Sequence, residues 1–230
     1  MNQMRAIPAV VGLAMTACLL FAGCGAREKI TRLDQLDGKE IAVPTGTIAD
    51  KLVLSRLPKA KFKYFNSVMD AAMAVSSGKV DAAAYDEPIL RNLAAKNGGL
   101  VVLPDMVTTD QYGFAVRLDR TDLKQAADSV IAELRKNGTY NDMLARWLPK
   151  AGAPAAMPEL PTTGDKGVLI FGTAAVTEPF SFVDGSRNIV GFDIEMAHRI
   201  AQRLGLKLEV VNMDFGGMIP ALAAGKVDMI

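Results

Sequence analysis

Two groups of residues in this chain have the chemistry needed to hold a small zwitterion. Asp86 follows a short apolar segment, Val80–Tyr85, which is predicted to be a buried strand, and it offers a fixed negative charge. Thr45, Gly46 and Thr47 follow another predicted strand and precede a helix, so free backbone N–H groups and two hydroxyls there suit a carboxylate. Because both groups follow parallel strands, we expect them to share one rim of a sheet. Together they could bind the ammonium and carboxylate groups of an amino acid.

Both groups also have a purely structural interpretation. Asp86 could instead cap the helix predicted over 88–96, which begins with Pro88. The turn Pro44–Thr47 lacks the Gly-Lys-Ser/Thr ending of a phosphate-binding loop, and an ordinary strand-to-helix connection explains it equally well. The two interpretations stay open at this point.

The side chains that commonly carry catalysis or metals give no pattern here. The single histidine, His198, groups with Glu195, Arg199 and Gln202 opposite the apolar stripe of a helix predicted over 192–204, so we expect His198 on a solvated surface. The chain has no serine–histidine–aspartate set, no histidine-bearing metal spacing and no phosphate loop. The sequence therefore predicts no enzyme, no metal site and no cofactor.

The elements that must position the candidate residues alternate between strand and helix. Strands are predicted over 39–43, 62–65, 80–85 and 100–103, and helices over 48–57, around 71–75 and over 88–96. This alternation favours an α/β fold with a mostly parallel sheet covered by helices on both faces. A strand over 112–118 and helices over 121–137 and 140–148 follow, with Trp147 expected as a core anchor.

A repeated tetrapeptide divides the chain into two similar units. Gly78–Asp81 and Gly225–Asp228 are both GKVD, and each follows an alanine-rich helix and opens a strand. The Pro- and Ala-rich segment 150–166 is predicted to be a linker between the units. The second unit is predicted to contain strands over 168–172, 180–183, 206–212 and from 227, with helices over 192–204 and 217–224.

The amino terminus resembles the export signal of a bacterial lipoprotein. Arg5 precedes an uncharged apolar run over 6–21, and Ala22 and Gly23 precede Cys24. We expect residues 1–23 to be the signal peptide, Cys24 to carry the lipid anchor in the membrane, and 24–32 to be a tether. The alternative is an ordinary secretory signal with an incidental cysteine. Either predicts a protein in the periplasm or at the cell surface, and the net charge of +1 gives no basic stripe for nucleic acid.

Several motifs together resemble one family, the polar amino-acid-binding proteins of bacterial ABC importers, or family 3 solute-binding proteins. In 167–230 the motifs that match the family's first lobe are EPFSF at 178–182, GFDI at 191–194, Phe215 with IPAL at 219–222, and GKVD. In 33–148 the motifs that match its second lobe and the return to the first are LDGK at 36–39, Gly46-Thr47, GKVD, Asp86, NGTY at 137–140, and Trp147.

The resemblance implies a fold and a set of roles. The fold is periplasmic-binding-protein-like type II, in which two α/β lobes joined by a hinge close on the ligand. By the same resemblance Asp86 binds the ligand's α-ammonium, and the loop Gly46–Ile48 binds its α-carboxylate. Phe180 and Phe215 match aromatic positions near the ligand's side chain. An ABC transporter permease is the implied partner.

The chain departs from the family pattern at several positions. Ala174 stands where the family has an acid, Thr177 where it has an aromatic residue, and Ile48 where it has a hydroxyl. The carboxylate-binding arginine, which follows the strand that begins at Val227 in the family, is absent. The resemblance therefore predicts a small polar ligand without identifying it.

The order of the lobes is reversed relative to the family. Residues 33–111 resemble the second lobe, 112–149 the return strand and helices, and 167–230 a truncated first lobe. The chain is either the front of a longer tandem protein or a permuted module, and both options predict that helices 121–137 and 140–148 pack on 168–230. The predicted function is an extracytoplasmic solute-binding component of an ABC importer. The alternatives are a ligand-sensing module of a signalling receptor and a non-binding remnant of a tandem protein.

Overall fold

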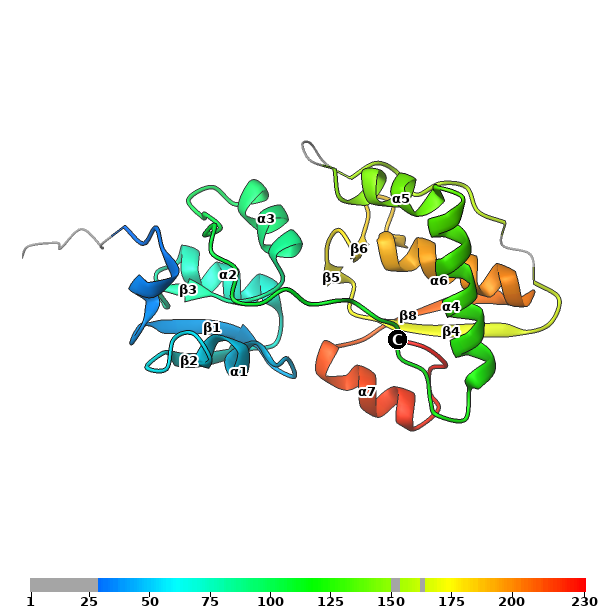
Figure 1. Ribbon diagram of the computed structural model, residues 1–230, viewed down its shortest axis with the longest axis horizontal. Helices are drawn as coiled ribbons and strands as arrows, with labels where there is room; N and C mark the ends of the chain where they lie inside the picture. Colours follow the sequence, from blue (N-terminus) through cyan, green and yellow to red (C-terminus); the bar gives the residue numbers. More distant parts are fainter. Residues whose placement is uncertain (1–28, 150–153, 162–163) are drawn as a thin grey trace, which may run out of the picture.

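The computed structural model describes residues 29–149, 154–161 and 164–230 (Figure 1). The predicted signal peptide 1–23, Cys24 and part of the predicted linker lie outside these ranges. Within them, no helix combines the length and apolar character that a membrane span requires. The chain forms two α/β lobes, which we call the N-terminal lobe (33–103) and the C-terminal lobe (the described part of 115–230) (Figure 1).

The N-terminal lobe is a parallel sheet between helices. Its strands are β1 (Glu40–Pro44), β2 (Lys61–Phe65) and β3 (Ala82–Ala83), in the order β2-β1-β3. Its helices are the 3-10 turn η1 (Leu33–Leu36), α1 (Ala49–Leu54), α2 (Val68–Ser76) and α3 (Glu87–Lys96).

The central strand β1 explains why helices cover both faces of this sheet. Alternate residues of a strand point to opposite faces. Ile41 and Val43 pack in a cluster with Val53 of α1, whereas Ala42 packs with Ala71 in the cluster that α2 covers. All these side chains are at most 3% exposed. Burial on both faces is typical of a parallel sheet and matches the predicted α/β class.

The C-terminal lobe is built on a second parallel pair. Strand β4 (Val168–Thr173) pairs with β8 (Lys207–Asn212), and β5 (Val176–Thr177), β6 (Ser181–Val183) and β7 (Ile189–Val190) form a small antiparallel sheet. Met229 bridges β4 on one side and Val116 on the other. The helices are α4 (Thr121–Lys136), α5 (Thr139–Trp147), α6 (Phe192–Leu204) and α7 (Phe215–Ala223).

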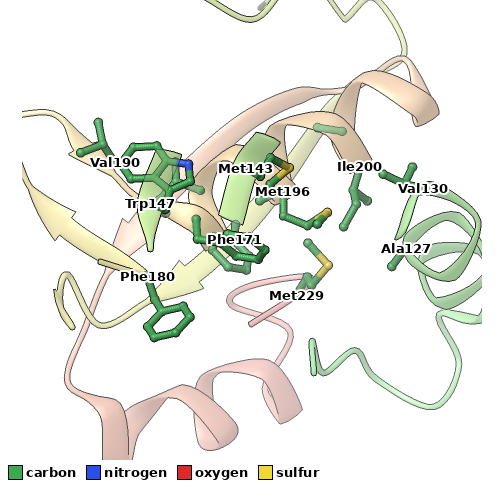
Figure 2. Packing of buried hydrophobic residues seen from close by; sticks show 14 of the residues in the cluster. Ala127, Val130, Met143, Trp147, Phe171, Phe180, Val190, Met196, Ile200 and Met229 are labelled. Atoms are coloured by element: carbon green, nitrogen blue, oxygen red, sulfur yellow. The ribbon is translucent and has the colours of Figure 1, made fainter. Parts of the chain in front are cut away.

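Helices α4 and α5 pack on the C-terminal lobe, where the sequence analysis expects them. Both contact α6, and one buried cluster holds residues of all three helices together with Phe171 of β4 (Figure 2). Leu123 and Met143 are fully buried in this cluster, and Trp147 is 1% exposed, as expected of a core anchor. At about 25 cal/mol per Å² of buried apolar surface, these large side chains are a major source of the lobe's stability.

Three predicted strands are wrong: those over 100–103 and 112–118, and the one from 227, which forms only bridges at Met229. Residues 100–103 form no strand, because their backbone is not paired with β3, although Leu103 packs on the apolar cluster under β1. The segment 112–118 forms one bridge, between Val116 and Met229. Ala115 and Ile230 exchange both of their backbone hydrogen bonds there, at 2.9 and 3.0 Å. The segment 112–118 is therefore held on the C-terminal lobe by this bridge and by ring contacts of Tyr112 with Phe180 and of Phe114 with Phe171.

Candidate functional site

Asp86 lies at the end of the N-terminal lobe's sheet that faces the other lobe. It follows β3 and occupies the position just before α3, but its side chain makes no capping hydrogen bond. The capping interpretation is therefore not supported. Burial raises the pKa of the Asp86 carboxyl, a hydrogen bond from the Tyr112 hydroxyl opposes this, and the charge of Asp110 raises it further.

Tyr112 connects Asp86 to the C-terminal lobe. Its ring centroid lies 4.8 Å from that of Phe180, at an interplanar angle of 45°. Phe180 is only 7% exposed, whereas Tyr112 is 63% exposed, so the tyrosine covers the phenylalanine and presents its own outer surface. Although the ring is exposed, desolvation of the hydroxyl and the neighbouring Asp86 charge raise the pKa of Tyr112, and the hydroxyl, protonated at neutral pH like that of any tyrosine, can donate a hydrogen bond.

Sequence reasoning missed Tyr112 because it was assigned to a strand over 112–118. The available signal was an aromatic residue directly before Gly113, in the connection between two predicted lobes. The structure brings this residue together with two predicted site residues, Asp86 and Phe180.

The predicted carboxylate loop faces α7 across the lobes. A Cβ atom built on Gly46 would lie 3.0 Å from Cα of Gly216 and 3.9 Å from a ring carbon of Phe215. Phe215 is 41% exposed, and Thr45 and Ile48 are also exposed. The loop and Phe215 are therefore neighbours, as a site between the lobes requires.

Some of the polar groups predicted to bind a carboxylate are used within the loop. The backbone N–H of Thr45 donates to the Phe65 carbonyl oxygen at 2.7 Å, and the Thr47 hydroxyl donates to the Pro44 carbonyl oxygen at 2.9 Å. The Thr47 hydroxyl also accepts from the Ala49 N–H at 3.4 Å. The turn thus holds its own shape, and a ligand would use the remaining backbone N–H groups of the loop.

Asp193 is a second carboxylate near this region that sequence reasoning did not select. It lies in the first turn of α6, and its backbone N–H donates to the Phe180 carbonyl oxygen at 3.0 Å. Burial raises the pKa of its carboxyl to about 7. The charge of Asp193 also acts on Tyr112, which places both near the same part of the interface. Its signal in the sequence was its place in the GFDI motif.

Glu195 is buried, although it lies on the side of α6 opposite the apolar stripe. Its carboxylate is fully buried and accepts from Trp147 Nε1 at 2.7 Å, Arg146 Nη1 at 2.9 Å and Arg199 Nη2 at 2.6 Å. The two guanidinium groups explain how a charged side chain tolerates this position. Periodicity placed Glu195 correctly on the polar side of α6 but could not show that α5 covers it.

His198, one turn further along α6, is half-buried, and this desolvation lowers the pKa of its imidazole. It lines a hollow of about 590 Å³ with Met157 and Val210, away from the predicted ligand residues. Among the described residues, no His, Cys, Asp and Glu side chains group in a way that could hold a metal ion.

Comparisons with known proteins match part of the chain to one family. Residues 169–230 match the model of the bacterial extracellular solute-binding proteins, family 3. Arginine-binding extracellular protein ArtP of Bacillus subtilis is 45% identical over 65 residues, which are 28% of this chain and 25% of that protein. ABC transporter arginine-binding protein 1 of Escherichia coli is 28% identical over 120 residues, 50% of this chain and 49% of that protein. The chain thus spans about half or less of these relatives' length.

Solved structures of arginine- and cystine-binding proteins also match part of the chain. Domain 1 of the arginine-bound T. maritima protein is 49% identical over 27% of this chain and 50% of that one, with a TM-score of 0.27. The unliganded, open L-cystine receptor of Neisseria gonorrhoeae is 31% identical over 28% of each chain, with the same TM-score. The family match confirms the resemblance for residues 169–230, and the model itself confirms the α/β class with parallel sheets.

Proposed function

We propose that this chain is the extracytoplasmic solute-binding component of an ABC importer and that it binds a polar amino acid between its two lobes. One observation carries the proposal. Tyr112 contacts Asp86 of the N-terminal lobe through its hydroxyl and Phe180 of the C-terminal lobe through its ring. A negative charge beside exposed aromatic surface suits the α-ammonium of an amino acid whose side chain can lie against the ring.

The predicted residues divide between the two ends of such a ligand. Asp86 binds the α-ammonium, and the loop Gly46–Ile48 binds the α-carboxylate through backbone N–H groups. Phe215 lies beside that loop and contacts the ligand's side chain. Because Tyr112 covers Phe180, we infer that the exposed ring of Tyr112, and not that of Phe180, contacts the ligand's side chain. Thr45 and Thr47 shape the loop.

Arginine is the first ligand to test for two reasons. The two relatives described above are named as arginine-binding proteins, and two carboxylates, those of Asp86 and Asp193, lie near Tyr112 in this chain. A guanidinium carries the charge that such a site attracts. The permease of an ABC importer is the proposed partner. Cleavage after residue 23 and lipidation of Cys24 would hold the protein in the periplasm or at the cell surface.

Isothermal titration of the chain with arginine, glutamine, histidine and cystine in turn tests the proposal. We expect a saturable heat with arginine that Asp86→Ala abolishes, because the ligand's ammonium would lose a charged partner worth about 2 to 5 kcal/mol. The matched control is Asp128→Ala, which removes an exposed carboxylate from α4 and should bind like the wild type. A folded chain that gives no heat with any amino acid would instead be the non-binding remnant of a tandem protein.

A further inference from the structure

The two lobes are held together mainly by non-covalent contacts. Within the described residues, the chain passes between them once, along 104–114 (Figure 1). The far end of this crossing is anchored on the C-terminal lobe through Ala115 and Ile230. A single covalent connection leaves the lobes free to rotate, so side-chain contacts must set the angle between them.

Helix α3 makes the polar contacts between the lobes. Lys96, in its last turn, forms an ion pair with the carboxylate of Glu178, which belongs to the C-terminal lobe. Asn92, one turn earlier, donates from its side-chain amide to the Glu178 carbonyl oxygen at 3.5 Å. Ile89 and Leu93 of the same helix are buried in the cluster that contains Phe180. One face of α3 is therefore docked on the opposite lobe.

The ion pair is placed to respond to opening. The side chain of Glu178 is 19% exposed, and Lys96 is its one cationic partner among the described residues. The next cation along the helix, Arg91, is already paired with Glu87 of α3 itself. Opening the lobes would separate Lys96 from Glu178 and hydrate both charges.

We propose that the Lys96–Glu178 ion pair is a latch that holds the two lobes closed over the candidate site. Helix α3 begins next to Asp86 and ends at this latch, about 15 Å away at 1.5 Å per residue. The closed latch thus fixes the helix at both ends and keeps Asp86 at the interface. Only the effect of the latch on ligand affinity rests on the proposed function, because its effect on the lobe angle needs no ligand.

Charge exchange tests the latch more sharply than simple removal, because Lys96 in the last turn also favours the helix itself. Lys96→Glu and Glu178→Lys each place two like charges opposite one another, and the double variant restores an attractive pair. Lys96→Gln is a milder second variant if a like-charge pair prevents folding. Arg91→Gln is the matched control, because it removes a cation from the same helix without touching the interface.

The readout is the radius of gyration of the ligand-free chain, measured by small-angle X-ray scattering at low and at about 1 M salt, where charges are screened within about 3 Å. We expect each single exchange, Lys96→Gln and high salt to increase the radius, the double exchange to restore it, and Arg91→Gln to leave it unchanged. A radius that stays at the wild-type value in both single exchanges, or that the double exchange does not restore, would overturn the latch.

Measuring the Kd for arginine then tests the proposed function independently of the latch. Partly exposed ion pairs are weak, so loss of this one should raise the Kd for arginine by about two- to fivefold. If the wild type binds no arginine, the proposed function fails, and the scattering result still decides on the latch. If arginine binds equally tightly to the wild type and to both single exchanges, the latch does not control the site.

Discussion

Replacing Asp193 with asparagine should change how the stability of the protein depends on pH. Asp193 lies in the first turn of α6 with no ion pair to a described residue, and burial raises its pKa from 3.8 to about 7. Asparagine has nearly the same shape and no titrating proton. The substitution therefore removes the burial cost of the charge while it keeps the packing.

The sign and size of the effect follow from the shift. Between its ordinary value and about 7, the folded state binds more protons at Asp193 than the unfolded state does, so the free energy of unfolding falls as the pH rises. Below the ordinary value the carboxyl is protonated in both states and makes no difference. At about 1.4 kcal/mol per pKa unit, the full penalty above pH 7 is at most about 4 kcal/mol.

The assay is urea denaturation at about pH 5, 6, 7 and 8. The free energy of unfolding of Asp193→Asn minus that of the wild type should grow from pH 5 to about pH 7 and level off towards pH 8, with a total change of a few kcal/mol and not more than about 4. Asp128→Asn, which removes an exposed carboxylate, is the control and should show no such trend. A difference between Asp193→Asn and wild type that stays constant within about 0.5 kcal/mol would refute the reasoning.

Three further substitutions test other parts of the structure. Glu195→Ala should lower the free energy of unfolding by about 1 to 3 kcal/mol in urea, since it leaves the buried Trp147 Nε1 and two partly exposed guanidinium groups without their acceptor; a loss below about 0.5 kcal/mol would contradict this. Gly46→Ala should cost more stability than Gly38→Ala, because both have positive φ but only the first meets the other lobe; equal losses would argue against the contact. Tyr112→Phe removes the hydroxyl that lowers the pKa of Asp86, so arginine binding should be lost on acidification at a higher pH than in the wild type; unchanged pH dependence by calorimetry would count against that hydrogen bond.

Local patterns predicted the elements of the fold well. The apolar run that became β1, the alanine-rich α2 and the amphipathic α4 and α6 each carry their own signal, because burial of one face follows from spacing along the chain. The packing of α4 on α6 could be predicted from the family resemblance. The missing strand at 100–103 shows the limit of such signals, since a strand also needs a partner backbone.

The candidate site was predictable only in part. Asp86 and Gly46 stand at strand ends, where a general rule of α/β folds points to ligands. Tyr112 acts through its contacts with Asp86 and Phe180, and Lys96 through its contact with Glu178, across the two lobes. Such pairs join residues far apart in the sequence, so spacing carries no information about them. The burial of Glu195 was missed for the same reason, because it depends on Arg146 and Trp147 of another helix.

The proposed function requires that a polar amino acid binds between the lobes, and hydrogen–deuterium exchange with and without arginine is the measurement that decides whether it does. Binding there should slow exchange on both sides of the interface: in the loop 45–48, at the start of α3 after Asp86, and at the start of α7 beside Phe215. Slower exchange in only one lobe, or none in these segments at saturating arginine, would contradict a site formed by the two lobes together.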